Sequence, residues 1–264
     1  MNTKQPLSPT SDAGSLAEYI RARTPARILV GRAGPAYRTA TQLELRRDHA
    51  AAVDAVHAEM DLDRDFDRQF VERWRLFLVK TQAADKQQYL MRPDLGRRLD
   101  HEAKQIVVEH CQAAVDFQVI IGDGLSVAAV LIQTPSLLPL LHAEAHRQGW
   151  TFGQPFCIRY CRVGILNEIG ELLKPVIEVL LIGERPGLAT AESLSAYMAY
   201  RPQPGHTDAQ RNLISNIHAG GVPCETAAKR IVALAEQMRQ LQTSGVTVKE
   251  ELRKREGRAN ALPY

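Results

Sequence analysis

The stretch VLLIGERPGL, residues 179–188, has the pattern of a buried strand that ends abruptly at a turn. Its first four residues are consecutively apolar, which is typical of a parallel strand that is covered on both faces. Gly183 ends the apolar run, and a Pro-Gly pair three residues later fixes a turn. The stretch therefore predicts a sheet between two layers of helices, with Glu184 and Arg185 presented at the tip of one strand.

The segments on either side of this strand extend the pattern. Helices are predicted between several further strands. These lie in FQVIIGDGLS (117–126), where the strand ends in a Gly-Asp-Gly turn, and in PFCIRYCRVG (155–164), LSAYMAY (194–200) and NLISNIH (212–218). Pro135 is expected to break the helix that begins at Val127. The fold class that follows is α/β, with a mostly helical N-terminal region and then a Rossmann-like, largely parallel three-layer α/β domain.

The domain boundaries follow from where the composition changes. Residues 1–13 are rich in Ser, Thr, Pro and Asp and are predicted to form a flexible tail. Residues 14–98 are predicted to form a helical N-terminal domain, and residues 99–264 the Rossmann-like α/β domain.

The bulk composition excludes several function classes. The 33 basic and 30 acidic residues leave a net charge of +3, which is too even to favour a nucleic-acid partner. No apolar run is long enough to span a membrane, and the polar N-terminus lacks a secretory signal. Four cysteines scattered through 264 residues predict reduced thiols in a cytoplasmic protein.

Three motifs could carry chemistry, and each has a simpler interpretation. The IGDGLS segment (121–126) could be a phosphate loop, but it matches neither common nucleotide-binding pattern, so a structural turn is favoured. His142 and His146 lie one helical turn apart with no third ligand, which favours a solvated helix face. Cys157 and Cys161 are expected on one face of a strand, too far apart to share a metal ion. No complete catalytic set and no metal site is predicted.

Polar loops follow four of the predicted strands. They are Asp123-Gly124, 162–164, 183–187 and 215–218. In a parallel sheet these loops gather at one edge, where ligands of α/β proteins bind. Backbone amides, an acid and an arginine at such an edge suit a large, amide-rich ligand. The alternative is that Glu184 and Arg185 form a surface ion pair of little energetic value.

Six sequence blocks make the chain similar to a known family. Between about residues 27 and 244 it resembles the small (light) subunit of ethanolamine ammonia-lyase, and the blocks are VGRAGPAYRT, DHAAAVDAV, YLMRPDLGRRL, VIIGDGLS, IGERPGLATAESLSAYMAY and ISNIHAGG. The resemblance implies a subunit of an adenosylcobalamin-dependent carbon–nitrogen lyase. The enzymes of this family convert ethanolamine to acetaldehyde and ammonia by a radical mechanism.

The resemblance also implies the partner and the place of work. The partner is a large subunit, a TIM barrel that carries the residues acting on ethanolamine, and the cobalamin lies between the two chains. The family assembles as hexamers of large–small pairs in the cytoplasm, in some members inside a bacterial microcompartment. No catalytic residue and no metal ligand is therefore expected in this chain.

Three cofactor-binding residues are implied by the family pattern: Val163, Glu184 and Leu213. The third position is a cysteine in some members and a leucine in this chain, so a contact there is expected through the backbone or through apolar packing. Two rival functions remain open at this point. One is a stand-alone cobalamin-binding module, and the other is a nucleotide-dependent enzyme that uses the GDGLS loop.

Overall fold

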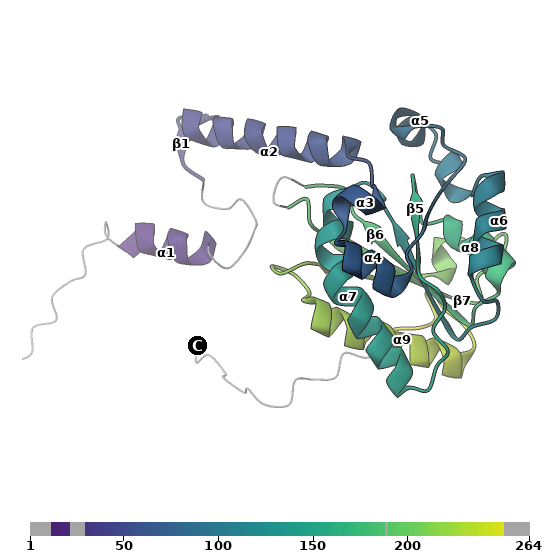
Figure 1. Ribbon diagram of the computed structural model, residues 1–264. Helices are drawn as coiled ribbons and strands as arrows, with labels where there is room; N and C mark the ends of the chain where they lie inside the picture. The colour runs from purple at the N-terminus through teal and green to yellow at the C-terminus, as the bar shows by residue number, and fades with distance from the viewer. Residues whose placement is uncertain (1–11, 22–29, 188–189, 251–264) are drawn as a thin grey trace, which may run out of the picture.

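The computed structural model describes residues 12–21, 30–187 and 190–250. A six-stranded sheet lies at its centre, in the order β3-β5-β4-β6-β7-β8 (Figure 1). The strands are β3 (Leu78–Lys80), β4 (Phe117–Gly122), β5 (Phe156–Arg159), β6 (Ile177–Gly183), β7 (Leu194–Tyr200) and β8 (Asn212–Ile217).

Helices cover both faces of the sheet, so the predicted three-layer α/β fold is confirmed. The long helices α7 (Val127–Arg147) and α9 (Cys224–Leu241) lie on one face, and α6 (His101–His110) and α8 (Ile165–Leu173) lie on the other (Figure 1). Residues alternate between the layers along β6. Val179 packs in the cluster with α7 and α9, whereas Leu180 packs in the cluster with α6 and α8.

Strand direction changes twice across the sheet. β3, β5, β4 and β6 are parallel, β7 is antiparallel to β6, and β8 is antiparallel to β7. The two reversals cancel, so β8 again runs in the direction of β6. The carboxyl ends of β4, β5, β6 and β8 therefore meet at one edge of the sheet, as the sequence predicted for the polar loops.

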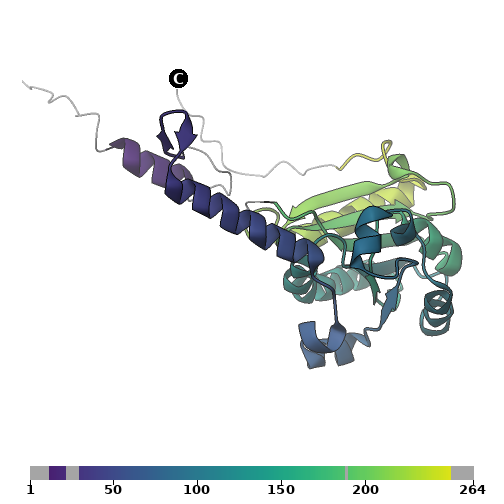
Figure 2. The same cartoon turned by 90° about the horizontal axis from the view of Figure 1, so that it is seen from above.

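The N-terminal region is mostly helical and includes an arm that extends from the body. Its elements are α1 (Asp12–Arg21), β1 (Arg32–Ala33), β2 (Ala36–Tyr37), α2 (Thr39–His57), α3 (Leu62–Asp65), α4 (Arg68–Trp74), α5 (Lys86–Met91) and the 3₁₀ helix η1 (Leu95–Arg97). Helix α2 protrudes from the layers and buries none of its residues (Figures 1 and 2). The predicted tail of residues 1–13 falls almost wholly outside the described residues.

Helix α7 passes through two prolines without a break, so the break predicted at Pro135 is wrong. Pro135 and Pro139 both lie inside the helix. Leu137, Leu138 and Leu141 beside them are completely buried, and this packing offsets the lost backbone hydrogen bonds. By length and composition alone α7 could cross a membrane, but here its apolar face packs against the sheet and α9 as a core helix.

A buried carboxyl group stands in the middle of β6. Glu178 is fully buried, and neither of its carboxyl oxygens has a hydrogen-bond partner among the described residues. Its neighbour on β4, Gln118, instead donates from its amide to the carbonyl oxygen of Gln154 (2.8 Å). Burial raises the pKa of Glu178 well above its ordinary value, and the Arg211 charge opposes this only in part. Glu178 therefore holds a proton at pH values where an exposed glutamate has lost it.

The folded chain is expected to lose stability as the pH rises, because of this carboxyl. A carboxyl group whose pKa is higher in the folded chain than in the unfolded chain contributes its full stabilisation of the fold at pH values below the unfolded-state pKa. Above that pKa, this contribution to the free energy of unfolding falls by about 1.4 kcal/mol per pH unit until the folded-state pKa is reached. Glu178→Gln, which is neutral at every pH, should remove the contribution of Glu178 to this slope. The measurement is thermal unfolding of both proteins from about pH 5 to pH 9. Glu171→Gln, an exposed carboxyl on α8, is the control. The same slope in wild type and Glu178→Gln would contradict the prediction.

Candidate functional site

The polar loops at the carboxyl edge of the sheet surround a hollow of about 250 Å³, called the rim hollow below. Val163 from the β5–α8 loop, Glu184 from the tip of β6 and Leu213 from β8 all line it. These residues come from three separate segments of the chain. The structure thus brings together the three residues that the family pattern singles out, and their role in binding stays a prediction.

The rim hollow extends over the face of β7 and β8 that is turned away from α7 and α9. Ala196 and Ile214 pack in the cluster with those two helices, so the alternating residues Tyr197 and Leu213 point to the opposite face. Tyr197 and Leu213 are cross-strand partners. Leu213 is 45% exposed, although it is apolar and lies within a strand. The hollow therefore has an accessible apolar wall.

Glu184 ties together the ends of three strands. Its Oε1 accepts hydrogen bonds from the hydroxyl of Ser195 (2.5 Å) and the backbone amide of Asn216 (3.1 Å), and its Oε2 accepts one from the hydroxyl of Ser193 (2.7 Å). No ion pair joins it to Arg185 among the described residues, so the surface-pair interpretation is wrong. The buried strand and three donors hold this carboxylate in one position at the rim.

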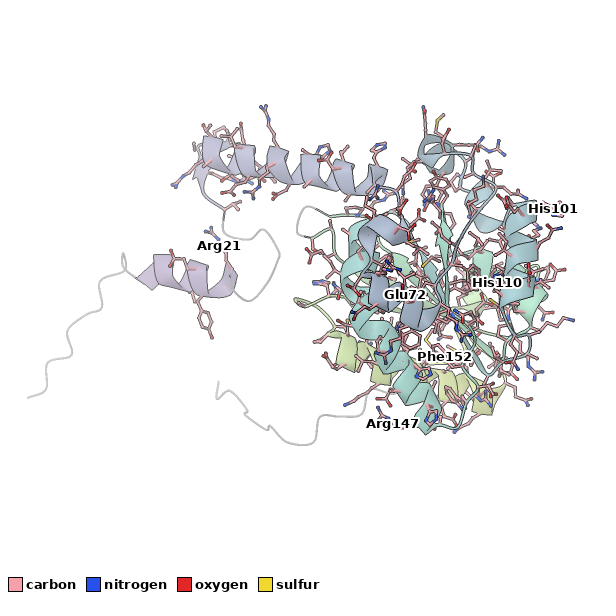
Figure 3. All side chains as sticks on the ribbon, viewed as in Figure 1. Arg21, Glu72, His101, His110, Arg147 and Phe152 are labelled. Atoms are coloured by element: carbon pink, nitrogen blue, oxygen red, sulfur yellow. The ribbon has the colours of Figure 1, made fainter. Side chains whose placement is uncertain are left out.

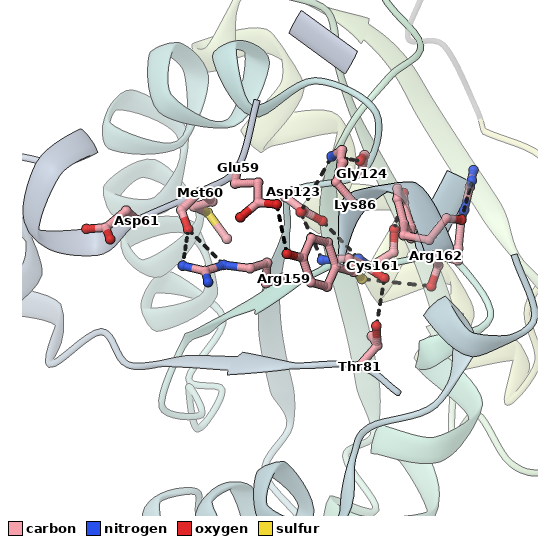
Figure 4. Close-up of polar contacts among 12 residues, drawn as sticks. Glu59, Met60, Asp61, Thr81, Lys86, Asp123, Gly124, Arg159, Cys161 and Arg162 are labelled. Carbon is pink, nitrogen blue, oxygen red and sulfur yellow. Dashed lines mark hydrogen bonds and ion pairs between the residues drawn. The ribbon is translucent and has the colours of Figure 1, made fainter. Parts of the chain in front are cut away.

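Asp123 fixes the start of the β5–α8 loop from inside the molecule (Figure 4). Its buried carboxyl group accepts hydrogen bonds from the backbone amides of Tyr160 (2.9 Å) and Cys161 (2.8 Å). The ammonium group of Lys86 lies 3.9 Å away and is also buried. Burial raises the pKa of Asp123 and lowers the pKa of Lys86, and the charge of each group opposes the shift of the other. These contacts position the backbone that leads into Val163.

The IGDGLS segment forms a structural turn, as the sequence favoured. Gly124 has a φ of 56°, and the amide of Leu125 donates to the carbonyl oxygen of Gly183 (3.1 Å). The hydroxyl of Ser126 accepts from the amide of Ala129 (3.2 Å) and caps α7. A phosphate loop needs free amides at this point, so the internal bonds argue against a nucleotide site here.

Two tyrosines in the rim hollow were not predicted from the sequence. Tyr89 reaches it from α5 and donates from its hydroxyl to the carbonyl oxygen of Cys161 (2.8 Å). Tyr197 reaches it from β7. The alternation within LSAYMAY could have placed Tyr197 on the same face as Ser195. No local signal identifies Tyr89, because only tertiary packing brings α5 to this edge.

The histidine pair on α7 belongs to an aromatic surface cluster. His142 and His146 are exposed, as predicted for a solvated helix face. The ring of His142 packs edge-on against two aromatic rings, with its centre 5.3 Å from that of Trp74 and 5.0 Å from that of Phe152. Phe152 is labelled in Figure 3. Among the residues that the structure describes, no group of three His, Cys, Asp or Glu side chains could hold a metal ion.

Cys157 and Cys161 lie on opposite faces of the sheet, so the prediction of a shared face is wrong. Cys157 packs in the cluster with α7 and α9, and Cys161 in the cluster with α6 and α8. The reason is that β5 ends at Arg159 and Tyr160 adopts a φ of 61°, which breaks the strand alternation before Cys161. Both thiols are buried and free.

The chain is similar in sequence to several known proteins. Residues 15–249 match the family model described as ethanolamine ammonia-lyase light chain (EutC). A protein of Clostridium perfringens named ethanolamine ammonia-lyase small subunit is 40% identical over 87% of this chain and 76% of its own length. Proteins of the same name from Pseudomonas fluorescens and Clostridium acetobutylicum are 41% and 38% identical, over 88% and 87% of this chain and 85% and 93% of their own lengths.

Proposed function

We propose a function from one established premise: the chain belongs to the ethanolamine ammonia-lyase light-chain family. The proposal is that it completes the adenosylcobalamin site of an ethanolamine ammonia-lyase, against a large subunit that binds and converts the substrate. The observation that carries it is the meeting of Val163, Glu184 and Leu213 in one accessible hollow. The small-subunit name of the relatives supports the large partner chain.

The residues of the rim hollow fit an edge of a corrin. Cobalamin carries amide side groups on an apolar macrocycle, so it needs acceptors beside apolar surface. Among the residues that the structure describes, Oε2 of Glu184 accepts a single hydrogen bond, which leaves one lone pair for an amide N–H. Val163, Tyr197 and Leu213 provide the apolar surface. A volume of about 250 Å³ admits part of the cofactor, so the partner chain must cover the rest.

The division of labour follows from the side chains present. When bound, adenosylcobalamin supplies the homolysis of its cobalt–carbon bond. This chain holds an acceptor at a fixed point with Glu184, and it excludes water with Val163 and Leu213. The acid and base chemistry on ethanolamine then belongs to the large subunit, for which we propose the TIM-barrel form and hexamers of large–small pairs. We further propose that the assembly works in the cytoplasm.

The test of this function is co-expression with the large subunit of a related enzyme. The co-purified pair should bind adenosylcobalamin and release ammonia from ethanolamine, and the light chain alone should do neither at a comparable level. Turnover by the light chain alone would refute the division of labour. Tight cobalamin binding by the light chain without the partner would instead support a stand-alone binding module.

Glu184→Ala should weaken cobalamin binding by the assembled pair about tenfold to a hundredfold, the equivalent of one or two lost hydrogen bonds. It also leaves the donors of Ser193, Ser195 and Asn216 without their acceptor, which loosens the tips of β6, β7 and β8. Glu192→Ala, an exposed carboxylate on the same β6–β7 connection, is the matched control. Equilibrium dialysis against cyanocobalamin measures the dissociation constants. Equal values for Glu184→Ala and wild type would remove Glu184 from the site.

A further inference from the structure

The segment that joins β3 to α6, residues 81–100, contacts the β5–α8 loop, and we call it the strap. The hydroxyl group of Thr81 donates a hydrogen bond to the carbonyl oxygen of Tyr160 (3.0 Å), and that of Tyr89 donates to the carbonyl oxygen of Cys161 (2.8 Å). Thr81 and Tyr89 are both buried. Two buried hydroxyl groups of the strap therefore fix the first residues of the loop.

Arg162, the next residue of the loop, binds the strap with both its backbone and its side chain. Its amide donates to the carbonyl oxygen of Gly96 (2.8 Å). Its guanidinium group stacks on Tyr89, 4.3 Å from the ring centre, and donates to the carbonyl oxygen of the same residue (3.4 Å). Three consecutive loop residues, 160–162, therefore take their positions from the strap, and the residue that follows them is Val163 of the rim hollow.

Lys86 joins the strap to the turn that follows β4 (Figure 4). Its side chain is only 6% exposed, and its ammonium nitrogen lies 3.4 Å from the carbonyl oxygen of Gly124 and 3.9 Å from Oδ2 of Asp123. The same nitrogen lies 5.0 Å from the centre of the Tyr89 ring. Within the part of the chain that the structure describes, Lys86 is the one basic residue that forms an ion pair with Asp123. A buried positive charge of the strap thus binds the β4–α7 turn, of which Gly124 lines the rim hollow.

The charge of Lys86 offsets the cost of burying the Asp123 carboxylate. Asp123 is completely buried, and its two oxygens accept hydrogen bonds from the backbone amides of Tyr160 and Cys161. Protonation would weaken one of these bonds, because it turns one acceptor oxygen into a hydroxyl group. Burial raises the pKa of Asp123, and the positive charge of Lys86 opposes that rise. Lys86 can therefore act on the β5–α8 loop through Asp123.

We propose that Lys86 is a positioning residue of the cofactor site, which acts through Asp123 to hold the β5–α8 loop at the rim hollow. The inference rests on the proposed function, because Val163 at the end of this loop is one of the three residues proposed to contact cobalamin. The buried pair contributes geometry and little net stability. It joins the strap, the β4–α7 turn and the β5–α8 loop at one point, so these three segments keep one arrangement when the cofactor enters.

The groups around this pair allow its charge to be tested by pH. Glu59 faces Lys86 from the segment after α2, and Arg162 faces it from the β5–α8 loop. The other titratable groups near Asp123 are Tyr89, Cys157, Tyr160 and Cys161. Burial raises the pKa of all four, so they stay uncharged from about pH 6 to about pH 8.5. A pH dependence that appears only when Lys86 is replaced is therefore assigned to Asp123.

The test compares cyanocobalamin binding by the co-purified large–small pair at about pH 6 and about pH 8.5. Wild type should bind equally well at both. In Lys86→Met the uncompensated Asp123 takes up a proton as the pH falls, so the dissociation constant should be roughly tenfold higher at the lower pH. The double variant Lys86→Met/Asp123→Asn has no titrating group here, so this pH dependence should vanish. Lys80→Met, which removes an exposed ammonium group from β3, is the control and should behave like wild type.

Hydrogen exchange gives a second measurement that needs no cofactor. In the co-purified pair before cyanocobalamin is added, the peptide that contains the amides of Tyr160 and Cys161 should be less protected in Lys86→Met than in wild type. The loss of protection should be larger at the lower pH. If the wild-type pair does not bind cyanocobalamin, the proposed function is refuted, and the exchange comparison alone decides whether Lys86 positions the loop.

Each other outcome overturns the inference. Equal weakening of binding at both pH values shows that Lys86 only fills space. A pH dependence that persists in the double variant belongs to a group other than Asp123. Unchanged binding and unchanged protection show that the rest of the strap holds the loop without Lys86. If Lys86→Met fails to fold, Lys86→Gln, which keeps N–H donors without the charge, decides the question by the same comparison.

Discussion

Gly124→Ala is expected to destabilise the folded chain by about 2–5 kcal/mol, the sum of a left-handed backbone penalty and an overpacking penalty. The φ of Gly124 is 56°, where a side chain is strained. An added Cβ would also lie 2.3 Å from the carbonyl oxygen of Gly183 and 2.6 Å from Cγ1 of Ile182. The nearer of these two atoms belongs to the backbone, so the β4–α7 turn and the end of β6 must move apart.

Gly149→Ala separates the two penalties. Gly149 also has a positive φ, of 73°, but no atom lies within 4 Å of the Cβ position. It should therefore lose only about 1–2 kcal/mol. Denaturant unfolding of both variants gives the comparison, and cobalamin affinity of the assembled pairs tests the second consequence. Since Gly124 and Gly183 line the rim hollow, only Gly124→Ala should weaken binding. Equal destabilisation by the two substitutions would show that the close approach of the two backbones is not rigid.

The sequence pattern predicts the centre of this fold better than its edges. Consecutive apolar residues identify β4 and β6, because a strand that is buried on both faces does not alternate apolar with polar residues. The sequence pattern does not predict β3, because this strand has only three residues and lies within a charged amphipathic segment. The direction of β7 and β8 is also not encoded locally. The direction of each strand depends on the path of the connection before it, and these connections have ordinary lengths. The direction of β8 nevertheless decides that the backbone amide of Asn216 donates a hydrogen bond to Glu184.

The candidate site was predictable to the extent that it consists of strand ends. Loops that follow parallel strands share an edge, so Asp123, Val163 and Glu184 could be expected near one another. The contacts that the carboxyl groups of Asp123 and Glu184 make inside the fold could not be predicted. Asp123 is buried beneath the loop it supports, and Glu184 accepts from serines nine and eleven residues later in the chain. Such contacts depend on the strand register, which the sequence pattern does not fix.

Leu213→Asp is expected to lower cobalamin affinity of the assembled pair by more than about a hundredfold, or to split the pair, because a buried unpaired charge costs several kcal/mol. In the isolated chain Leu213 is 45% exposed, so the aspartate stays hydrated there and the fold should be unaffected. Once the cofactor and the partner cover the rim hollow, its carboxylate must lose water beside Glu184, which already carries negative charge.

Leu213→Cys distinguishes charge from shape at the same position. It removes roughly two methylene-sized groups, worth about 1–2 kcal/mol if the site is fully covered, and it introduces no charge. The cysteine variant should therefore assemble and turn over much like wild type. Unfolding of the isolated variants, cobalamin content after co-purification and ammonia release give the three measurements. The expected pattern is two stable chains, of which only the aspartate variant loses the cofactor. An aspartate variant with full cofactor content and normal turnover would place Leu213 in open solvent within the assembly and remove it from the site.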